Sequence, residues 1–219
     1  MKALFQAAEW TRFLHSRSKL LAGTLFLATL AGGLALTLRP ALAGVSDATS
    51  KELDPWFLTG SDPGSYRIGI DREGLGHGHA AAFLQSTVQQ PAGFGTIMQS
   101  IAAAKYAGKR IRFEASVRSE NVSDWAGLWM RINRGTAIVG FDNMQKRPIK
   151  GSQGWTRYDV VLDVPADATD ISFGALLTGP GELWLSQVKF DSVGADVATT
   201  SPTAKDSLPS EPGNLSFGR

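Results

Sequence analysis

A short segment in the middle of the chain carries the side chains best suited to ligand binding. Residues 125–133 read Trp-Ala-Gly-Leu-Trp-Met-Arg-Ile-Asn. If the aliphatic residues of this segment point into a core, the two-residue period of a strand puts Trp129 and Arg131 on the opposite face. An indole ring beside a guanidinium offers a stacking surface together with directed hydrogen-bond donors. The pair therefore predicts a site for a glycan or a small organic ligand.

Further polar residues are expected around this pair, namely Gln99, Glu114, Asp142 and Asn143. Glu114 alternates with apolar neighbours in its own strand, so it could form an ion pair with Arg131. A simpler interpretation stays open, in which the ion pair lies on an exposed sheet and Trp129 only packs. Asp142 and Asn143 equally suit a turn, because Asp and Asn side chains bond their own backbone there.

Signals for catalysis are weak. The chain has no Gly-x-Ser-x-Gly motif, and no candidate nucleophile has a visible base. A carboxylate pair for glycoside hydrolysis would have to come from Glu114, Asp142, Asp159 or Asp163. We predict no catalytic residue and favour a non-enzymatic role. A small hydrolase, lyase or isomerase using the same face is the alternative.

Metal-binding patterns are equally weak. The two histidines of the segment Gly76-His77-Gly78-His79 lack a third ligand nearby. Cysteine is absent, which excludes disulfides and thiolate metal sites. We predict no cofactor and no metal ligand, although Asp71 and Glu73 leave a structural calcium site open.

The N-terminal segment is typical of export. Residues 20–37 form an uncharged apolar run that follows Arg12, Arg17 and Lys19, and a small-x-small site precedes Gly44. We expect a signal peptide over residues 1–43, or alternatively a retained membrane anchor, since about 18 residues nearly span a bilayer. The domain would then be periplasmic or secreted, or else held outside the cytoplasm at the inner membrane.

The charge distribution argues against nucleic acid as a partner. The formal net charge is +2, but residues 1–43 hold five basic residues and one acidic residue. The remainder of the chain is therefore mildly acidic, whereas a phosphate-tracking surface needs clustered Lys and Arg. A protein partner remains open, and contact with a membrane is expected only through an uncleaved N-terminal segment.

Alternating apolar and polar residues predict an all-β domain over residues 54–193. Strands are expected at residues 66–70, 96–101, 111–118, 128–133, 158–164, 171–177 and 183–190, with Gly and Pro turns between them. The run 101–106 is the only helix-like stretch. Residues 44–53 are expected to be a linker, and residues 194–219, rich in Ser, Thr and Pro, a flexible tail.

Several motifs together resemble one bacterial domain family. They are Phe94-Gly95-Thr96-x-Met98-Gln99, Gly127-Leu128-Trp129-Met130-Arg131, Phe141-Asp142-Asn143-Met144 with Arg147-Pro148-Ile149, and Val161-Leu162-Asp163-Val164-Pro165. The family occurs alone or fused to AraC-type transcriptional regulators, secreted peptidases and esterases. The resemblance implies a β-sandwich or jelly roll (galactose-binding-like), here preceded by an N-terminal hydrophobic helix. It implies a module role without a defined ligand, so a sensor or regulatory domain acting through a partner protein is a further alternative.

Overall fold

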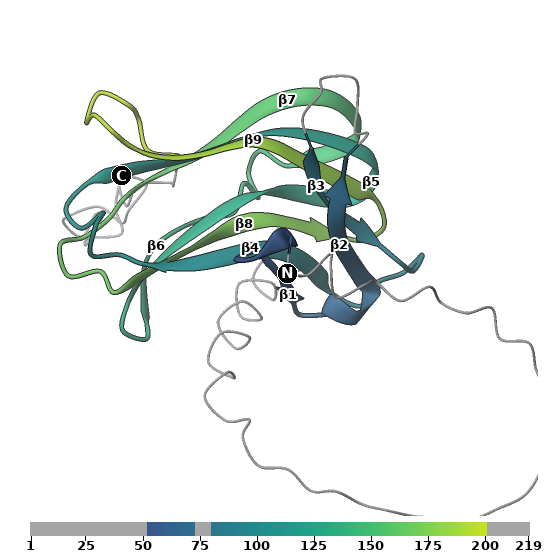
Figure 1. The fold of residues 1–219 in the computed structure, drawn as a ribbon, viewed down its shortest axis with the longest axis horizontal. Helices are drawn as coiled ribbons and strands as arrows, with labels where there is room; N and C mark the ends of the chain where they lie inside the picture. Colours follow the sequence, from purple (N-terminus) through teal and green to yellow (C-terminus); the bar gives the residue numbers. More distant parts are fainter. Residues whose placement is uncertain (1–51, 73–79, 201–219) are drawn as a thin grey trace, which may run out of the picture.

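The computed structural model describes residues 52–72 and 80–200 of the chain. This part is an all-β sandwich (Figure 1). Its elements, in chain order, are β1 (Phe57–Gly60), the 3-10 turn η2 (Pro63–Ser65), β2 (Tyr66–Asp71), β3 (Ala81–Ser86), β4 (Phe94–Ala102), β5 (Arg110–Arg134), β6 (Ala137–Asp142), β7 (Ile149–Asp163), β8 (Asp170–Thr178) and β9 (Glu182–Val193).

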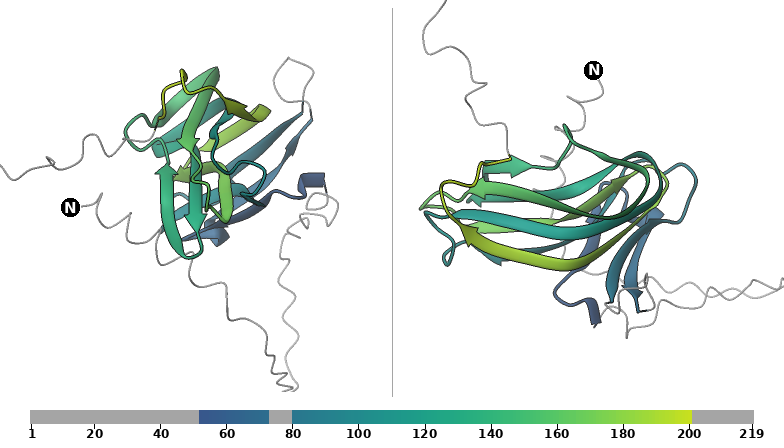
Figure 2. Two further views of the ribbon diagram at one scale, coloured as in Figure 1. Left: turned by 90° about the vertical axis from the view of Figure 1, so that its left-hand side faces the viewer. Right: turned by 90° about the horizontal axis from the view of Figure 1, so that it is seen from above.

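Strand β5 belongs to both layers of the sandwich. Its first half pairs with β7 on one side and β9 on the other, and its second half pairs with β8 and β6. The β9 layer therefore contains β2, β3, β9, the first half of β5 and most of β7. The β8 layer contains β1, β4, β8, the second half of β5 and β6. Figure 2 shows the two layers stacked, with the long strands running side by side.

The main core lies between these layers. It is built from the alternate, inward-facing residues of the long strands, such as Phe113 and Val117 of β5 and Ile171 and Phe173 of β8. Because successive side chains of a strand point to opposite faces, the intervening residues face outward. Leu128, Met130 and Ile132 are all in this core, as their spacing predicts.

The all-β prediction is confirmed, with differences in detail. All predicted strands are present, but 111–118 and 128–133 are two parts of the single strand β5. The helix-like run 101–106 is instead the end of β4 followed by turns. The predicted hydrophobic helix and signal segment lie outside the described residues, as do most of the linker and the last part of the tail. Within residues 52–72 and 80–200, no helix has the length and apolar character needed to cross a membrane.

Residues 194–200 pack on the sandwich, although their composition predicts the start of a tail. Thr200 accepts a hydrogen bond from the backbone N–H of Val161 on its hydroxyl, and its own N–H donates to the carbonyl of Val161. Arg110 also donates to the carbonyls of Ala195 and Val197. These bonds are made mainly through the backbone of the segment, which explains why composition gives no sign of them.

Candidate functional site

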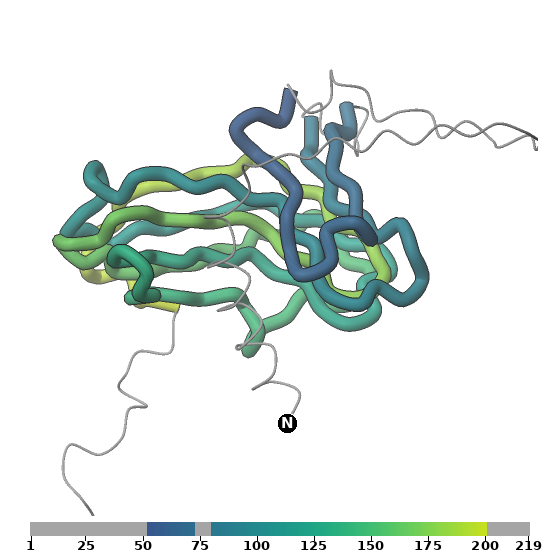
Figure 3. Tube along the Cα trace, turned by 90° about the horizontal axis from the view of Figure 1, so that it is seen from below, coloured from purple at the N-terminus to yellow at the C-terminus, as the bar shows by residue number. Residues whose placement is uncertain are grey.

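The outer side of the β8 layer carries a second, smaller group of buried side chains. Its members are Phe94, Met98, Trp125, Trp129 and Leu176, with Phe57 and Phe141 packed against them. Together with Thr96, Ser100, Arg131 and Ser172 they form what we call the outer β8 face. Figure 3 views the molecule from this side, with β1, in dark blue, near the viewer. A sandwich already closed around its core does not require such a cluster outside one of its layers.

Trp129 is the centre of the apolar half of this face. Its side chain is 0% exposed, and its indole N–H donates to the hydroxyl of Thr96 at 2.8 Å. That hydroxyl donates in turn to the carbonyl of Ala175 at 2.7 Å. Trp129 therefore lies opposite the main core, as its position in the strand predicts, but it is packed and bonded rather than an exposed stacking platform. Its role in the site is to hold the neighbouring side chains of the outer β8 face in place.

Arg131 lies in the polar half, in a row that runs across the layer. Strand register places Ser172 of β8 on one side of it and Phe141 of β6 on the other. Ser172 is in turn opposite Ser100 of β4, and their hydroxyl oxygens are 2.8 Å apart. The row thus combines a guanidinium, two hydroxyls and a half-buried aromatic ring.

The guanidinium of Arg131 is buried and makes no ion pair with the residues that the structure describes. Arg131 is 7% exposed, and its Nε makes no hydrogen bond within the described part of the chain. Burial lowers the pKa of Arg131, and the charge of Asp170 offsets this in part. Asp170 itself accepts hydrogen bonds from the amide of Asn133 and the hydroxyl of Thr169. Its carboxylate is thus engaged by neutral donors.

Gln99 and Glu114 do not join this face, so their predicted grouping around Trp129 and Arg131 is wrong. Gln99 is opposite Phe173, a residue of the main core, and therefore lies on the inner side of β4. Glu114 lies on the outer side of the β9 layer, where it faces Arg157 at 3.3 Å and Lys189 at 3.8 Å. The predicted ion pair between Glu114 and Arg131 fails because β5 passes from one layer to the other between them.

Asp142 is the last residue of β6, and Asn143 begins the turn that follows this strand. The carboxylate of Asp142 accepts the backbone N–H of Met144 at 2.8 Å and pairs with Arg147 at 2.6 Å. The amide oxygen of Asn143 accepts the N–H of Gln145. Both side chains thus bond their own backbone two residues on, which is the turn interpretation. They are sequence neighbours of Phe141 and lie beside the outer β8 face rather than on it.

Sequence reasoning missed Thr96, Ser100 and Ser172. The first two alternate with core residues of β4, so their outward direction could be read from the period of two. Their proximity to Trp129 and Arg131 depends on the pairing of β4 with β8 and of β8 with β5. That register joins residues far apart in the sequence, and nothing local specifies it.

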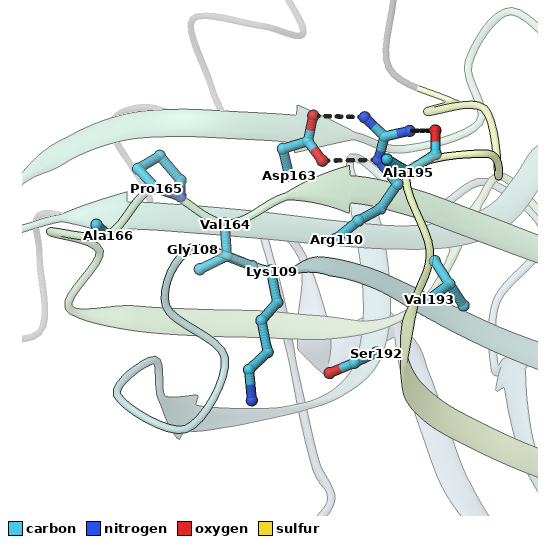
Figure 4. Close-up of a pocket in the computed structure, with 10 residues that line it drawn as sticks. All are labelled: Gly108, Lys109, Arg110, Asp163, Val164, Pro165, Ala166, Ser192, Val193 and Ala195. Atoms are coloured by element: carbon cyan, nitrogen blue, oxygen red, sulfur yellow. Dashed lines mark hydrogen bonds and ion pairs between the residues drawn. The ribbon is translucent and has the colours of Figure 1, made fainter.

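Two hollows lie elsewhere on the sandwich. One, of about 480 Å³, lies where the β5, β7 and β9 strand ends meet, beside Arg110 and Asp163. Figure 4 shows Arg110 bonded to both carboxylate oxygens of Asp163 and to the carbonyl of Ala195. That arrangement holds the 194–200 segment in place. All donors of Arg110 drawn there are directed at the protein, so this hollow is a structural junction.

The second hollow, of about 470 Å³, is polar and includes Gln85, Glu120, Asn121 and Glu182. Glu120 and Glu182 are directly opposite each other on β5 and β9. Burial raises the pKa of Glu182. The positive charge of Arg67 lowers this pKa in part, and the negative charges of Glu120 and Asp71 raise it further. Gln85 donates to the carboxylate of Glu182 at 3.0 Å. None of these residues was singled out by sequence.

The residues weighed for metal binding lie mostly outside the part of the chain that the structure describes. Glu73, His77 and His79 lie outside the described residues. Among residues 52–72 and 80–200, no group of three or more His, Cys, Asp or Glu side chains is arranged to hold a metal ion.

Comparison with known proteins gives one clear relative by sequence. The chain is 41% identical over 169 residues to a Bacillus subtilis (strain 168) protein named "Uncharacterized HTH-type transcriptional regulator YbfP". The match covers 76% of this chain and 57% of the relative, so the chain spans a little over half the length of the protein it matches. The name of this relative agrees with the predicted resemblance to domains fused to regulators. No protein-family model matches the chain.

Solved structures align with this chain at low sequence identity. The enzymatically active domain of tailspike protein 4 of bacteriophage CBA120 aligns with a TM-score of 0.50 and 12% identity, over 68% of this chain and 21% of that one. This likeness concerns the fold alone. The CBM22-1 xylan-binding domain of Paenibacillus barcinonensis Xyn10C aligns with a TM-score of 0.44 and 11% identity, over 64% and 86% of the two chains. That second likeness is too distant to bear on function.

Proposed function

We propose that this chain is an exported, non-catalytic binding module that holds a glycan or a small organic ligand on the outer β8 face. The observation that supports this most is the second aromatic cluster outside the sandwich, with a buried guanidinium and two hydroxyls in the adjoining row. Binding sites for small molecules combine apolar and aromatic walls with a few convergent polar groups. The outer β8 face has this composition, whereas the outer side of the β9 layer carries paired charges.

The two halves of the face have separate roles in this proposal. The apolar cluster forms the wall against which a ring-shaped ligand would lie. Arg131, Ser100 and Ser172 supply hydrogen bonds that fix its orientation. Trp129 and Thr96 act as positioning residues, because their polar atoms are bonded to each other. Asp142 and Asn143 shape the adjoining turn.

Binding is tested with the full-length protein on a glycan array and by thermal shift against mono- and oligosaccharides. Arg131→Gln should abolish a ligand-induced rise in melting temperature. The matched control is Arg157→Gln, which removes a guanidinium from the other layer and should leave binding intact. A wild-type protein that shows no ligand-induced shift, or loss of binding in both variants alike, contradicts the proposal.

A second candidate, a sensor domain that acts through a partner protein, is supported by the name of the Bacillus subtilis relative. Export separates the exported module from a sensor whose partner protein is in the cytoplasm, because such a sensor must stay there with its partner. Residues 1–60 fused to alkaline phosphatase should give an active enzyme if the segment is exported, since that enzyme needs an oxidising compartment for its disulfides. Inactive fusions, with a cytoplasmic reporter active in the same position, would favour the sensor.

A further inference from the structure

We infer that the ligand of the outer β8 face carries a carboxylate and that Arg131 binds it, as it would bind the acidic group of a hexuronic acid. This inference rests on the proposed function and narrows it to a chemical class. It is carried by the position of one charge, the burial around it and the lack of an ion pair to it among residues 52–72 and 80–200.

Arg131 differs from the other arginines of the described residues in both burial and pairing. It is the only arginine among the buried polar residues there. Ion pairs to carboxylates are made by Arg72, Arg110, Arg118, Arg134, Arg147 and Arg157. The guanidinium with the least water around it is thus one that lacks an ion pair within residues 52–72 and 80–200.

A charge removed from water is unfavourable unless a counterion or several hydrogen bonds replace the lost hydration. The charge of Asp170 raises the pKa of Arg131 in part, but no ion pair joins the two side chains within the described residues. The two carboxylate oxygens of Asp170 are occupied by Asn133 and Thr169. The donors of Arg131 therefore remain for a group that comes from outside the described fold.

The surroundings favour a planar anion. A guanidinium matches a carboxylate through two parallel hydrogen bonds, a geometry that lysine cannot supply. The hydroxyls of Ser100 and Ser172 share one hydrogen bond between them, so one hydroxyl hydrogen of this pair is left to donate to a ligand.

The same arrangement discriminates against neutral ligands. A neutral sugar covering the face would bury the charge of Arg131 further without neutralising it. A site built for a polar group rejects analogues that lack that group, because its own buried atoms are then left unpaired. The acidic sugar should bind at least ~10-fold more tightly than its neutral counterpart, and added salt should weaken it only modestly, since a buried pair is poorly screened.

The first experiment measures binding of matched probes to the full-length protein by calorimetry. The probes are glucuronate with glucose, galacturonate with galactose, and acetate, each as the sodium salt where charged. Tighter binding of a hexuronate than of its neutral partner supports the inference. Acetate binding as tightly as the hexuronates also supports a carboxylate, but assigns a small organic acid as its source. Equal binding of acidic and neutral sugars overturns the inference and leaves the proposed function standing. No binding of any sugar, on the array or by calorimetry, and none of acetate removes both.

The second experiment needs no ligand. Arg131→Met replaces the buried charge with an apolar side chain of similar length, and Arg131→Lys keeps the charge but loses the planar fork. Without ligand, Arg131→Met should melt at or above the wild-type temperature, because an unneutralised charge has been removed. Arg131→Lys should weaken hexuronate binding at least ~10-fold while remaining folded. A marked drop in the melting temperature of Arg131→Met would show that Arg131 supports the fold and would overturn the inference.

Discussion

At the scale of single residues, Trp129 and Arg131 share a face but differ in what they contribute. The indole N–H of Trp129 is bonded to Thr96 and its ring is packed in the cluster, so neither is available to a ligand. Arg131 is buried on the same face with its Nε unbonded within the described fold. Of the predicted pair, Arg131 is therefore the better candidate for direct ligand contact, and Trp129 is a structural residue.

Trp129→Ala should destabilise the protein by about 3–5 kcal/mol, because it removes a fully buried large ring and leaves a cavity. Trp129→Phe keeps most of the volume and loses one hydrogen bond, which contributes about 1 kcal/mol. Urea unfolding followed by far-UV circular dichroism measures both. A change below about 1 kcal/mol for Trp129→Ala would contradict the packing described. Loss of ligand binding in that variant alone would not identify a contact residue.

Glu182 should make stability depend on pH in a distinctive direction. Because its folded pKa is raised, mainly by burial, the folded state binds more protons than the unfolded state just above the ordinary glutamate pKa. Stability is therefore lost as the pH rises through this window. Glu182→Gln should be more stable than wild type at pH 7, and the difference should disappear as the pH falls below the ordinary glutamate pKa. Chemical denaturation across this pH range measures it.

Asp163 provides a control of opposite sign. The hydrogen bond from Arg110 lowers the pKa of Asp163, so its stabilising contribution is present above the ordinary aspartate pKa and is lost in acid. Asp163→Asn should be less stable than wild type at pH 7 and equal to it at low pH. If both variants changed stability in the same direction at pH 7, a general charge effect would explain them instead.

Sequence reasoning reached the outward direction of Trp129 and Arg131 but not their neighbours. The direction follows from a period of two within one strand, which is a local property. The neighbours Ser100 and Ser172 follow from the order β4-β8-β5, a property of the whole sheet. Glu114 was misplaced for a related reason. The residues between Glu114 and Gly127 include no Gly or Pro, so the sequence gives no sign that the strand changes layer before Arg131.

At the scale of elements, the change of layer within β5 has identifiable causes. The pairing of β5 with β7 shifts register between Val117 and Ala126, and Asn121 has a φ of 52°, in the left-handed region. Asn tolerates that conformation better than other side chains. Gly181, just before β9, lies against this bend. These irregularities bend a strand that would otherwise serve one layer, and sequence patterns without a turn signal do not reveal them.

Gly181→Ala should destabilise the protein by roughly 2 kcal/mol or more. Gly181 has a φ of 142°, and a Cβ there would lie 2.8 Å from the Cα of Val122, so both strain and a backbone clash oppose the substitution. The matched control is Gly154→Ala in β7, where an added Cβ meets no atom within 4 Å. The control should change the unfolding free energy by less than about 0.5 kcal/mol. Comparable losses in both variants would contradict a specific role for the bend.

At the scale of the whole molecule, the folded unit extends past its predicted end. The segment that follows β9 is bonded to β5 by Arg110 and to β7 by Thr200. The predicted start of the tail at residue 194 reflects a polar composition with few large apolar residues, which is a sound guide to core formation. Composition does not detect a segment that is held by main-chain hydrogen bonds.

Truncation tests this boundary. A chain that ends after Thr200 should melt at the wild-type temperature, because it keeps every bond described for the segment. A chain that ends after Val193 should melt at a lower temperature, because Arg110 loses the carbonyls of Ala195 and Val197, and Val161 loses its bonds to Thr200. Differential scanning calorimetry of the two chains gives the comparison, and identical melting temperatures would place the boundary back at residue 193.

The sharing of β5 between the layers makes the sandwich a single cooperative unit. Its first half lies inside one layer and its second half inside the other, so neither layer can separate from the rest without breaking hydrogen bonds of the same continuous strand. A ligand held on the outer β8 face would therefore slow amide hydrogen exchange in the β9 layer as well, although it touches no residue there. Binding of a ligand to this face would therefore also make the entire domain more resistant to proteolysis.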